Sequence, residues 1–63
     1  MRLLIVDDHK IVREGIANIA MREGIEVVGE ACNKEEALAL LAATTPDVIT
    51  IDLSLPEIGR AHV

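Results

Sequence analysis

An α/β fold built on three parallel strands is predicted by two observations. The sequence carries three short apolar runs, at residues 3–6, 27–28 and 48–51. Two segments with the character of helices separate these runs, at about 10–23 and 33–45. Each segment is long enough to form a crossover connection, which makes the strands that it joins parallel. The predicted order is therefore strand, helix, strand, helix, strand.

The first and third runs are the strongest strand candidates. Residues 3–6 read Leu-Leu-Ile-Val and residues 48–51 read Val-Ile-Thr-Ile, both continuous rather than alternating. Continuous runs of this kind are typical of strands buried on both faces of a parallel sheet. Val27 and Val28, followed by Gly29, form a shorter run. For this run we expect a strand nearer the edge of the sheet.

The first helix is predicted from about residue 10 to residue 23. Val12, Ile16 and Ile19 recur at spacings of four and three residues, with Ala20 beside them. This spacing puts them on one helical face, which we expect to pack on the sheet. Gly24 is expected to end the helix. The charged residues of the segment are expected to lie largely elsewhere: Arg13, Glu14, Arg22 and Glu23.

The second helix has clearer boundaries. Asn33 can accept hydrogen bonds from the first amides of a helix, and Glu36 three residues later completes a capping box. Thr44 and Thr45 precede Pro46, and the residue before a proline is disfavoured in the right-handed α region. If the first strand lies between the other two, right-handed crossovers place the two helices on opposite faces of the sheet.

Composition and charge exclude several classes of protein. The chain has 63 residues, 51% of them hydrophobic and none aromatic, so its core consists of aliphatic residues and alanine. A net charge of −5 argues against contact with nucleic acid or an anionic membrane surface. No apolar run approaches the roughly 20 residues that span a bilayer. Cys32 is the only cysteine, which excludes a disulfide framework. We expect a cytoplasmic protein.

Three carboxylates follow the two strong strands. Asp7 and Asp8 come after the first strand and Asp52 after the third. On neighbouring parallel strands, about 4.8 Å apart, these residues meet at the carboxyl edge of the sheet. Gathered oxygen ligands favour a hard cation such as Mg²⁺, and a carboxylate can also accept a phosphoryl group. The alternatives are that Asp7 or Asp8 caps the next helix and that Asp52 is a turn residue.

The motifs along the chain resemble the receiver domain of bacterial two-component response regulators, in the NarL/FixJ branch. They are Leu-Ile-Val-Asp-Asp-His at 4–9, Val-Arg-Glu-Gly at 12–15, Val-Val-Gly-Glu-Ala at 27–31, Glu-Glu-Ala-Leu at 35–38, and the stretch from Pro46 to Pro56. The resemblance implies a flavodoxin-like (CheY-like) parallel sheet with strand order 2-1-3-4-5. We expect this chain to hold only its βαβαβ N-terminal half.

The resemblance also implies roles for individual residues. Asp52 is the phospho-acceptor, which takes a phosphoryl group from a sensor histidine kinase. Asp8 and Asp52 ligate Mg²⁺ through their side chains, Ser54 through its backbone carbonyl, and Asp7 through a bound water. The domain is then a phosphorylation switch rather than an enzyme. A DNA-binding domain is expected in the longer protein, a transcription regulator, and we expect His9 to cap the first helix or to line the acidic site.

The end of the chain departs from the family pattern. Gly59 directly follows Ile58, where the family places an Asp or Asn before the glycine. The last six residues match the in-frame translation of a common sequencing-library adapter. We therefore expect residues 1–57 to be a partial receiver domain and residues 58–63 to be a non-native tail. Without the second half, the third strand becomes an exposed edge, and we expect the chain to fold poorly alone.

Two other classes of function remain open. The chain can be a truncated, non-enzymatic binding module that lacks phosphotransfer activity. It can also be a metal-dependent phosphohydrolase, although such enzymes commonly place a second Asp two residues after the first, where this chain has Ser54. Dinucleotide-binding and nucleotide-triphosphatase units are disfavoured because neither glycine-rich phosphate motif occurs.

Overall fold

The computed structural model describes residues 1–52 and contains the five predicted elements. They are β1 (Arg2–Asp7), α1 (Lys10–Arg22), β2 (Glu26–Ala31), α2 (Lys34–Thr44) and β3 (Val48–Asp52). The predicted order of strands and helices is confirmed. Ser54 and the expected tail at 58–63 lie outside the described residues. Neither helix of this part of the chain is long and apolar enough to cross a membrane.

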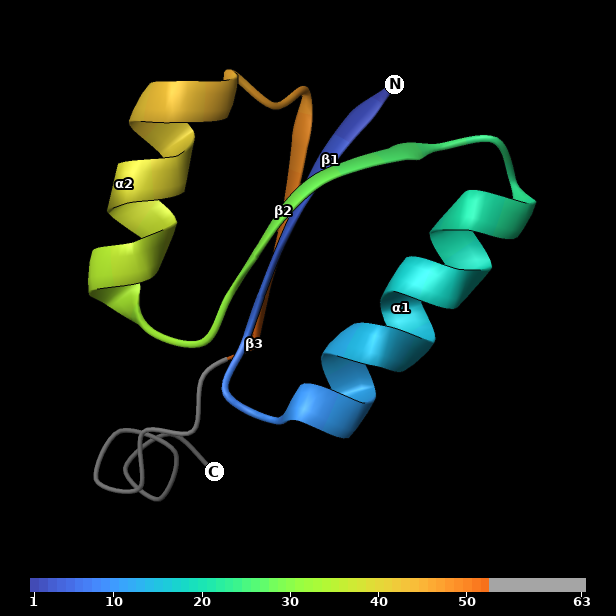
Figure 1. Cartoon of the computed structure of the whole chain (residues 1–63), viewed down its shortest axis with the longest axis horizontal. Helices are drawn as coiled ribbons and strands as arrows, with labels where there is room; N and C mark the ends of the chain where they lie inside the picture. The colour runs from blue at the N-terminus through green and yellow to red at the C-terminus, as the bar shows by residue number, and fades with distance from the viewer. Residues whose placement is uncertain (53–63) are drawn as a thin grey trace, which may run out of the picture.

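The three strands form one parallel sheet in the order β2-β1-β3. The first strand is therefore central. Right-handed crossovers from a central first strand place the two helices on opposite faces of the sheet, as predicted. Figure 1 shows α1 and α2 on opposite sides of the strands. The fold thus has three layers, with one helix over each face of the sheet.

The core is centred on β1, whose side chains alternate between the two faces. Leu3 and Ile5 point toward α1, and Leu4 and Val6 toward α2. All four are at most 6% exposed. Two-sided burial explains why this strand is a continuous apolar run rather than an alternating one. The remaining buried apolar residues are Ala17 and Ala20 of α1 and Ala31 of β2.

The inward face of α1 differs from the expected one. Ala17 and Ala20 are buried and Ile16 packs against them, but Val12 and Ile19 are 43% and 55% exposed. The prediction was wrong for these two residues because the helix approaches the sheet through its alanines. Small side chains permit a close approach, and the larger ones then lie at the flanks of the contact.

Strand β3 also differs from expectation. Its run predicts burial on both faces, but Val48, Ile49 and Ile51 are all at least 36% exposed. The reason is that β3 pairs only with β1 within residues 1–52, and neither helix packs on it. The expectation that this strand forms an exposed edge is confirmed for the described part of the chain.

The helix ends follow the predicted signals. The amide of Glu36 donates to Asn33 Oδ1 at 2.8 Å, which confirms the N-cap of α2. The capping box differs on its other side: the Glu36 carboxylate accepts from the amide of Cys32 at 2.9 Å, one residue before the cap, and not from the amide of Asn33 as predicted. Gly24, two residues after the end of α1, has φ +76, a conformation that favours glycine. At the end of α2, Thr45 turns the chain out of the helix with φ 45 and ψ 66.

Candidate functional site

The carboxyl edge of the sheet brings the two predicted acidic positions together. Strands β1 and β3 pair in parallel register, with Asp7 opposite Asp52 as the last pair. Neighbouring strands lie about 4.8 Å apart, so the backbones of these residues are adjacent. Asp8 and His9 follow Asp7 directly, and α1 begins at Lys10. In open α/β sheets, this edge is where ligands bind.

Asp7 is the buried member of the site, with 1% of its side chain exposed. Its Oδ1 accepts a hydrogen bond from the backbone N–H of His9 at 2.8 Å, which fixes the turn between β1 and α1. Its Oδ2 is buried and has no hydrogen-bond partner among the described residues. A buried polar atom without a partner is costly, so this oxygen marks a position that is suited to bind a ligand.

The structure does not support the alternative that Asp7 or Asp8 is the N-cap residue of α1. The N-cap residue of α1 is His9, whose side chain makes no capping hydrogen bond. Neither aspartate occupies that position. Of the two roles expected for His9, the structure favours the second, because the imidazole lies beside the acidic pair.

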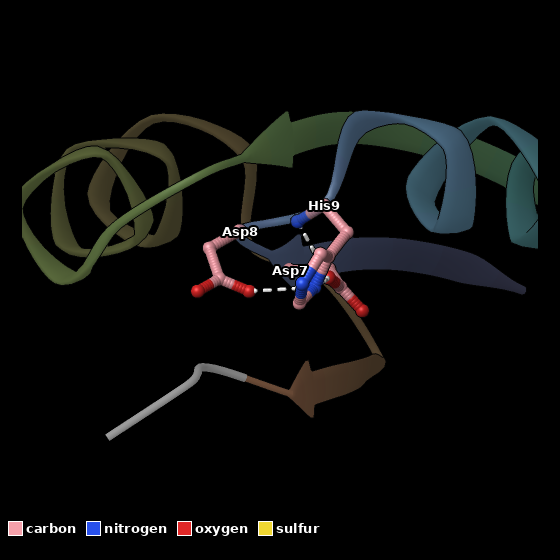
Figure 2. Close-up of side chains that lie close together, drawn as sticks. All are labelled: Asp7, Asp8 and His9. Carbon is pink, nitrogen blue, oxygen red and sulfur yellow. Dashed lines mark hydrogen bonds and ion pairs between the residues drawn. The ribbon is translucent and has the colours of Figure 1, made fainter. Parts of the chain in front are cut away.

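Asp7, Asp8 and His9 form one close group (Figure 2). One ligand atom from each residue lies within 4.8 Å of the others. His9 Nδ1 is 2.9 Å from Asp8 Oδ1 and 3.3 Å from Asp7 Oδ1. The side chains of His9 and Asp8 are 61% and 33% exposed, so solvent reaches the group from one side.

The predicted residues are not all in this group. Asp52 is placed opposite Asp7 by the strand register, but its exposed carboxylate is not a member of the three-residue group. Its strand is an outer one of the described sheet and no described helix packs on it, so fewer neighbours fix the side chain there. Ser54, the other predicted ligand, lies outside the described residues.

Arg13 is a residue at the site that the sequence analysis placed elsewhere. Its Nη1 donates to the backbone carbonyl of Asp7 at 2.7 Å, and its Nε lies 3.5 Å from Glu30 Oε1. Only 16% of its side chain is exposed. The guanidinium therefore links β1 to α1 and places a positive charge near the acidic edge. The sequence signal that could have placed Arg13 at the site is its position one helical turn after His9. The His9 carbonyl accepts a hydrogen bond from the Arg13 amide at 3.0 Å.

The donor set fits a divalent cation. Two adjacent carboxylates at the edge of the sheet supply hard oxygen ligands, and a third lies at the end of the neighbouring strand. Like charges that are gathered in one place favour a bound cation or protonation. The unpaired Asp7 Oδ2 is a further acceptor at the same place. Mg²⁺ typically takes one or two carboxylates and keeps several waters, which an open site of this kind permits.

Comparisons with known proteins agree with this geometry. The family profile described as the response regulator receiver domain matches residues 3–59. The chain is 47% identical over 58 residues to the uncharacterized transcriptional regulatory protein YhcZ of Bacillus subtilis. It is 43% identical over 60 residues to the response regulator GacA of Pseudomonas viridiflava. These matches include 90% and 94% of this chain, but only 27% and 28% of the two relatives.

A solved structure matches the fold as well. It is the crystal structure of a two-component response regulator of the LuxR family from Aurantimonas sp. SI85-9A1. The TM-score is 0.78 at 48% sequence identity, covering 87% of this chain and 40% of that one. The arrangement of three strands and two helices is therefore that of the first part of a flavodoxin-like domain.

Proposed function

The chain belongs to the response regulator receiver domain family, and from that premise we propose that it accepts a phosphoryl group on Asp52 from a sensor histidine kinase. The observation that carries the proposal is the register pair Asp7–Asp52, which sets the acceptor position beside the acidic end of β1. Asp52 is exposed, so a partner protein can reach its carboxylate.

In the proposed reaction, a carboxylate oxygen of Asp52 attacks the phosphorus of a phosphohistidine. The phosphorus–nitrogen bond breaks as the new phosphorus–oxygen bond forms, and the departing imidazole takes up a proton. Asp7 is held in place by the His9 amide, and Arg13 fixes the backbone of Asp7 from α1. These contacts orient the acidic edge before the partner arrives.

We propose Mg²⁺ as the cofactor of this site. The side chains of Asp8 and Asp52 and the backbone carbonyl of Ser54 would hold the ion, with Asp7 acting through a water. When bound, the ion neutralises charge on the oxygens of the transferred phosphoryl group. Asp7, Asp8 and Asp52 are acidic residues at one edge of the sheet, which supports this assignment.

The rest of the proposal concerns a longer protein. The chain spans about a quarter of the relatives named above, one of which is called a transcriptional regulatory protein. We propose that residues 1–57 are the first part of a receiver domain in a cytoplasmic transcription regulator, and that residues 58–63 are a non-native tail. A separate domain of that protein would bind DNA, without contact from this acidic segment.

Phosphorylation of the chain is directly testable. Incubation with acetyl phosphate and Mg²⁺ is expected to add the mass of one phosphoryl group, and Asp52→Ala is expected to abolish the adduct. Glu35→Gln, which alters an exposed carboxylate on α2, is the matched control and should leave the adduct unchanged. An adduct that persists in Asp52→Ala would show that another residue is the acceptor.

The exposed β3 edge favours a second candidate function, a binding module without phosphotransfer activity. The same experiment separates the two. A folded chain that binds Mg²⁺ but gains no phosphoryl mass supports the binding module. Phosphorylation of Asp52 would exclude a binding module that lacks phosphotransfer activity.

A further inference from the structure

We propose that Glu30 of β2 is a positioning residue for the phosphoryl-transfer site, and that it acts through Arg13 of α1. Glu30 holds the Arg13 guanidinium, and Arg13 in turn holds the peptide bond between Asp7 and Asp8. The inference rests on the proposed function, because it concerns the rate at which Asp52 takes up a phosphoryl group. What it adds is a contribution to that site from β2, which lies on the other side of β1 from β3.

Arg13 is the link between β2 and the acidic edge. Its Nη1 donates to the backbone carbonyl of Asp7 at 2.7 Å, and its Nε lies 3.5 Å from Glu30 Oε1. The carbonyl of Asp7 and the amide of Asp8 belong to one planar peptide group. A hydrogen bond to this carbonyl therefore fixes the direction in which the chain leaves β1, and with it the position from which the Asp8 side chain starts.

The Arg13 guanidinium depends on the Glu30 charge to stay in this place. The Arg13 side chain is 16% exposed, and its Nε is buried without a hydrogen-bond partner among residues 1–52. A charge removed from water is costly unless it is paired, and a partly buried pair is screened less than an exposed one. Neutralising Glu30 leaves the carboxylates of the acidic edge to attract the guanidinium, which is expected to draw it away from the Asp7 carbonyl.

A register shift in the sheet aims the Glu30 side chain at α1. The pairing of β1 with β2 shifts by one residue between Leu3 and Leu4. Side chains alternate along a strand, and paired residues of parallel neighbours share a face. Without the shift, Glu30 would pair with Val6, which points toward α2, but in the structure it pairs with Ile5, which points toward α1. Bulges often lie next to active sites, where they redirect a side chain in this way.

The rate of phosphorylation by acetyl phosphate with Mg²⁺ tests the proposal. We expect Glu30→Gln to lower the rate at saturating acetyl phosphate by about tenfold, the lower end of the effect of groups that orient active-site ligands. The acetyl phosphate concentration that gives half of the maximal rate should stay within about twofold, because Glu30 acts on the site and not on the phosphodonor. Equal maximal rates in the wild type and Glu30→Gln would overturn the proposal.

Glu26→Gln is the matched control. Glu26 lies on the same strand, and its Oε2 is 3.5 Å from Arg2 Nη1, the same separation as between Glu30 and Arg13. The control therefore removes the same charge and a similar ion pair at the beginning of β2, and its rate should equal that of the wild type. If Glu26→Gln lowers the rate as much as Glu30→Gln, the cause is the lost ion pair or charge, and the positioning role is wrong.

A double-mutant cycle tests whether Glu30 acts through Arg13. Arg13→Met keeps an unbranched side chain but loses every hydrogen-bond donor, and we expect it to lower the maximal rate by about tenfold or more. In this background Glu30→Gln should cause no further fall, since the residue through which it acts is gone. A rate that falls by the product of the two single effects would show that Glu30 acts independently of Arg13, contrary to the proposal.

A measurement on the wild type covers the case in which the variants fail to fold. A guanidinium held by the Asp7 carbonyl rotates slowly, so separate Nη1 and Nη2 resonances are expected for Arg13 and averaged ones for the exposed Arg22. Averaged Arg13 resonances contradict the proposal. The two failures are distinguished, because absence of any adduct in the wild type overturns the proposed function. An adduct that forms equally fast in the wild type and Glu30→Gln overturns this inference alone.

Discussion

At the scale of single residues, the N-cap of α2 depends on the Asn33 side chain. Its Oδ1 accepts the Glu36 amide at 2.8 Å. We expect Asn33→Ala to destabilise the chain by about 1 kcal/mol, the usual cost of losing such a cap. Asn33→Asp keeps an acceptor oxygen and should remain near the wild type. Urea unfolding followed by far-ultraviolet circular dichroism measures both, and an equal loss in the two variants would contradict this role.

The same turn predicts a pH dependence. The hydrogen bond from the Cys32 amide lowers the pKa of Glu36 below its usual value. A carboxyl group whose pKa is depressed by folding contributes stability that is present above its unfolded pKa, about 4.3, and lost as the pH falls through the folded value. Glu36→Gln keeps an acceptor oxygen but does not titrate.

Urea midpoints of the wild type and Glu36→Gln are expected to differ at neutral pH, with the wild type more stable. The difference should shrink as the solution is acidified below about pH 4.3. A constant difference from neutral to acidic pH would show that the Glu36 charge makes no contribution. Because this residue is exposed, we expect the effect to be small and to weaken further in salt.

The structural roles of some residues could be predicted from their neighbours in the sequence, and those of others could not. The Asn33–Glu36 pair and Gly24 could be assigned because capping and left-handed turns depend on a few adjacent residues. The hydrogen bond with Glu36 raises the pKa of the Cys32 thiol, a contact that also depends on adjacent residues of the same turn. His9 and Arg13 could not be assigned, because their contacts depend on the path of the chain from β1 into α1.

At the scale of the elements, Gly29 sets how closely α2 packs on β2. A Cβ atom at this position would lie 3.1 Å from both Leu40 methyl carbons and 3.3 Å from Leu4 Cδ1. Leu4 is fully buried and cannot move away, whereas Leu40 is only half-buried. We expect Gly29→Ala to destabilise the chain by about 1 kcal/mol, at the low end of overpacking costs.

A double-mutant cycle tests the cause of that loss. If the clash with Leu40 is responsible, Leu40→Ala should cost less in the Gly29→Ala background than in the wild type, since the two changes then compensate. Urea unfolding of the four proteins gives the coupling energy. Strictly additive losses would place the cost of Gly29→Ala in the strand backbone rather than in this contact.

The elements also show where pattern-based prediction stops. The order, the parallel pairing and the opposite placement of the helices follow from apolar runs, connection lengths and handedness, all of which are properties of the chain. The inward face of α1 does not follow, because the spacing of Val12 and Ile19 identifies apolar residues without saying how wide the sheet beneath them is. The burial of β3 likewise depends on neighbours that its own sequence does not contain.

At the scale of the whole molecule, the described core is small and is centred on one strand. Four of its seven buried apolar residues belong to β1, and the other three are alanines. Short chains bury a small fraction of their surface, so their stability is marginal. The expectation that this chain folds poorly alone stays a prediction, and the small core supports it.

The exposed edge of β3 predicts self-association. Within residues 1–52, β3 pairs on one side only, and Ile51 is 69% exposed. An apolar strand with unpaired backbone groups is a template for pairing with another chain, and an edge lysine opposes such pairing. We therefore expect the wild-type chain to associate as its concentration rises and Ile51→Lys to shift it toward the monomer, as measured by sedimentation velocity.

The variant Ile11→Lys tests whether self-association depends on the β3 edge or on exposed apolar surface in general. Ile11 is 82% exposed and belongs to α1 rather than to the sheet, and its substitution adds the same positive charge. If strand pairing drives association, this variant should associate as the wild type does. If Ile11→Lys reduces association as much as Ile51→Lys, the cause is net charge or total apolar surface, and β3 has no special part in it. Only a difference between the two variants assigns the association to the edge of the sheet.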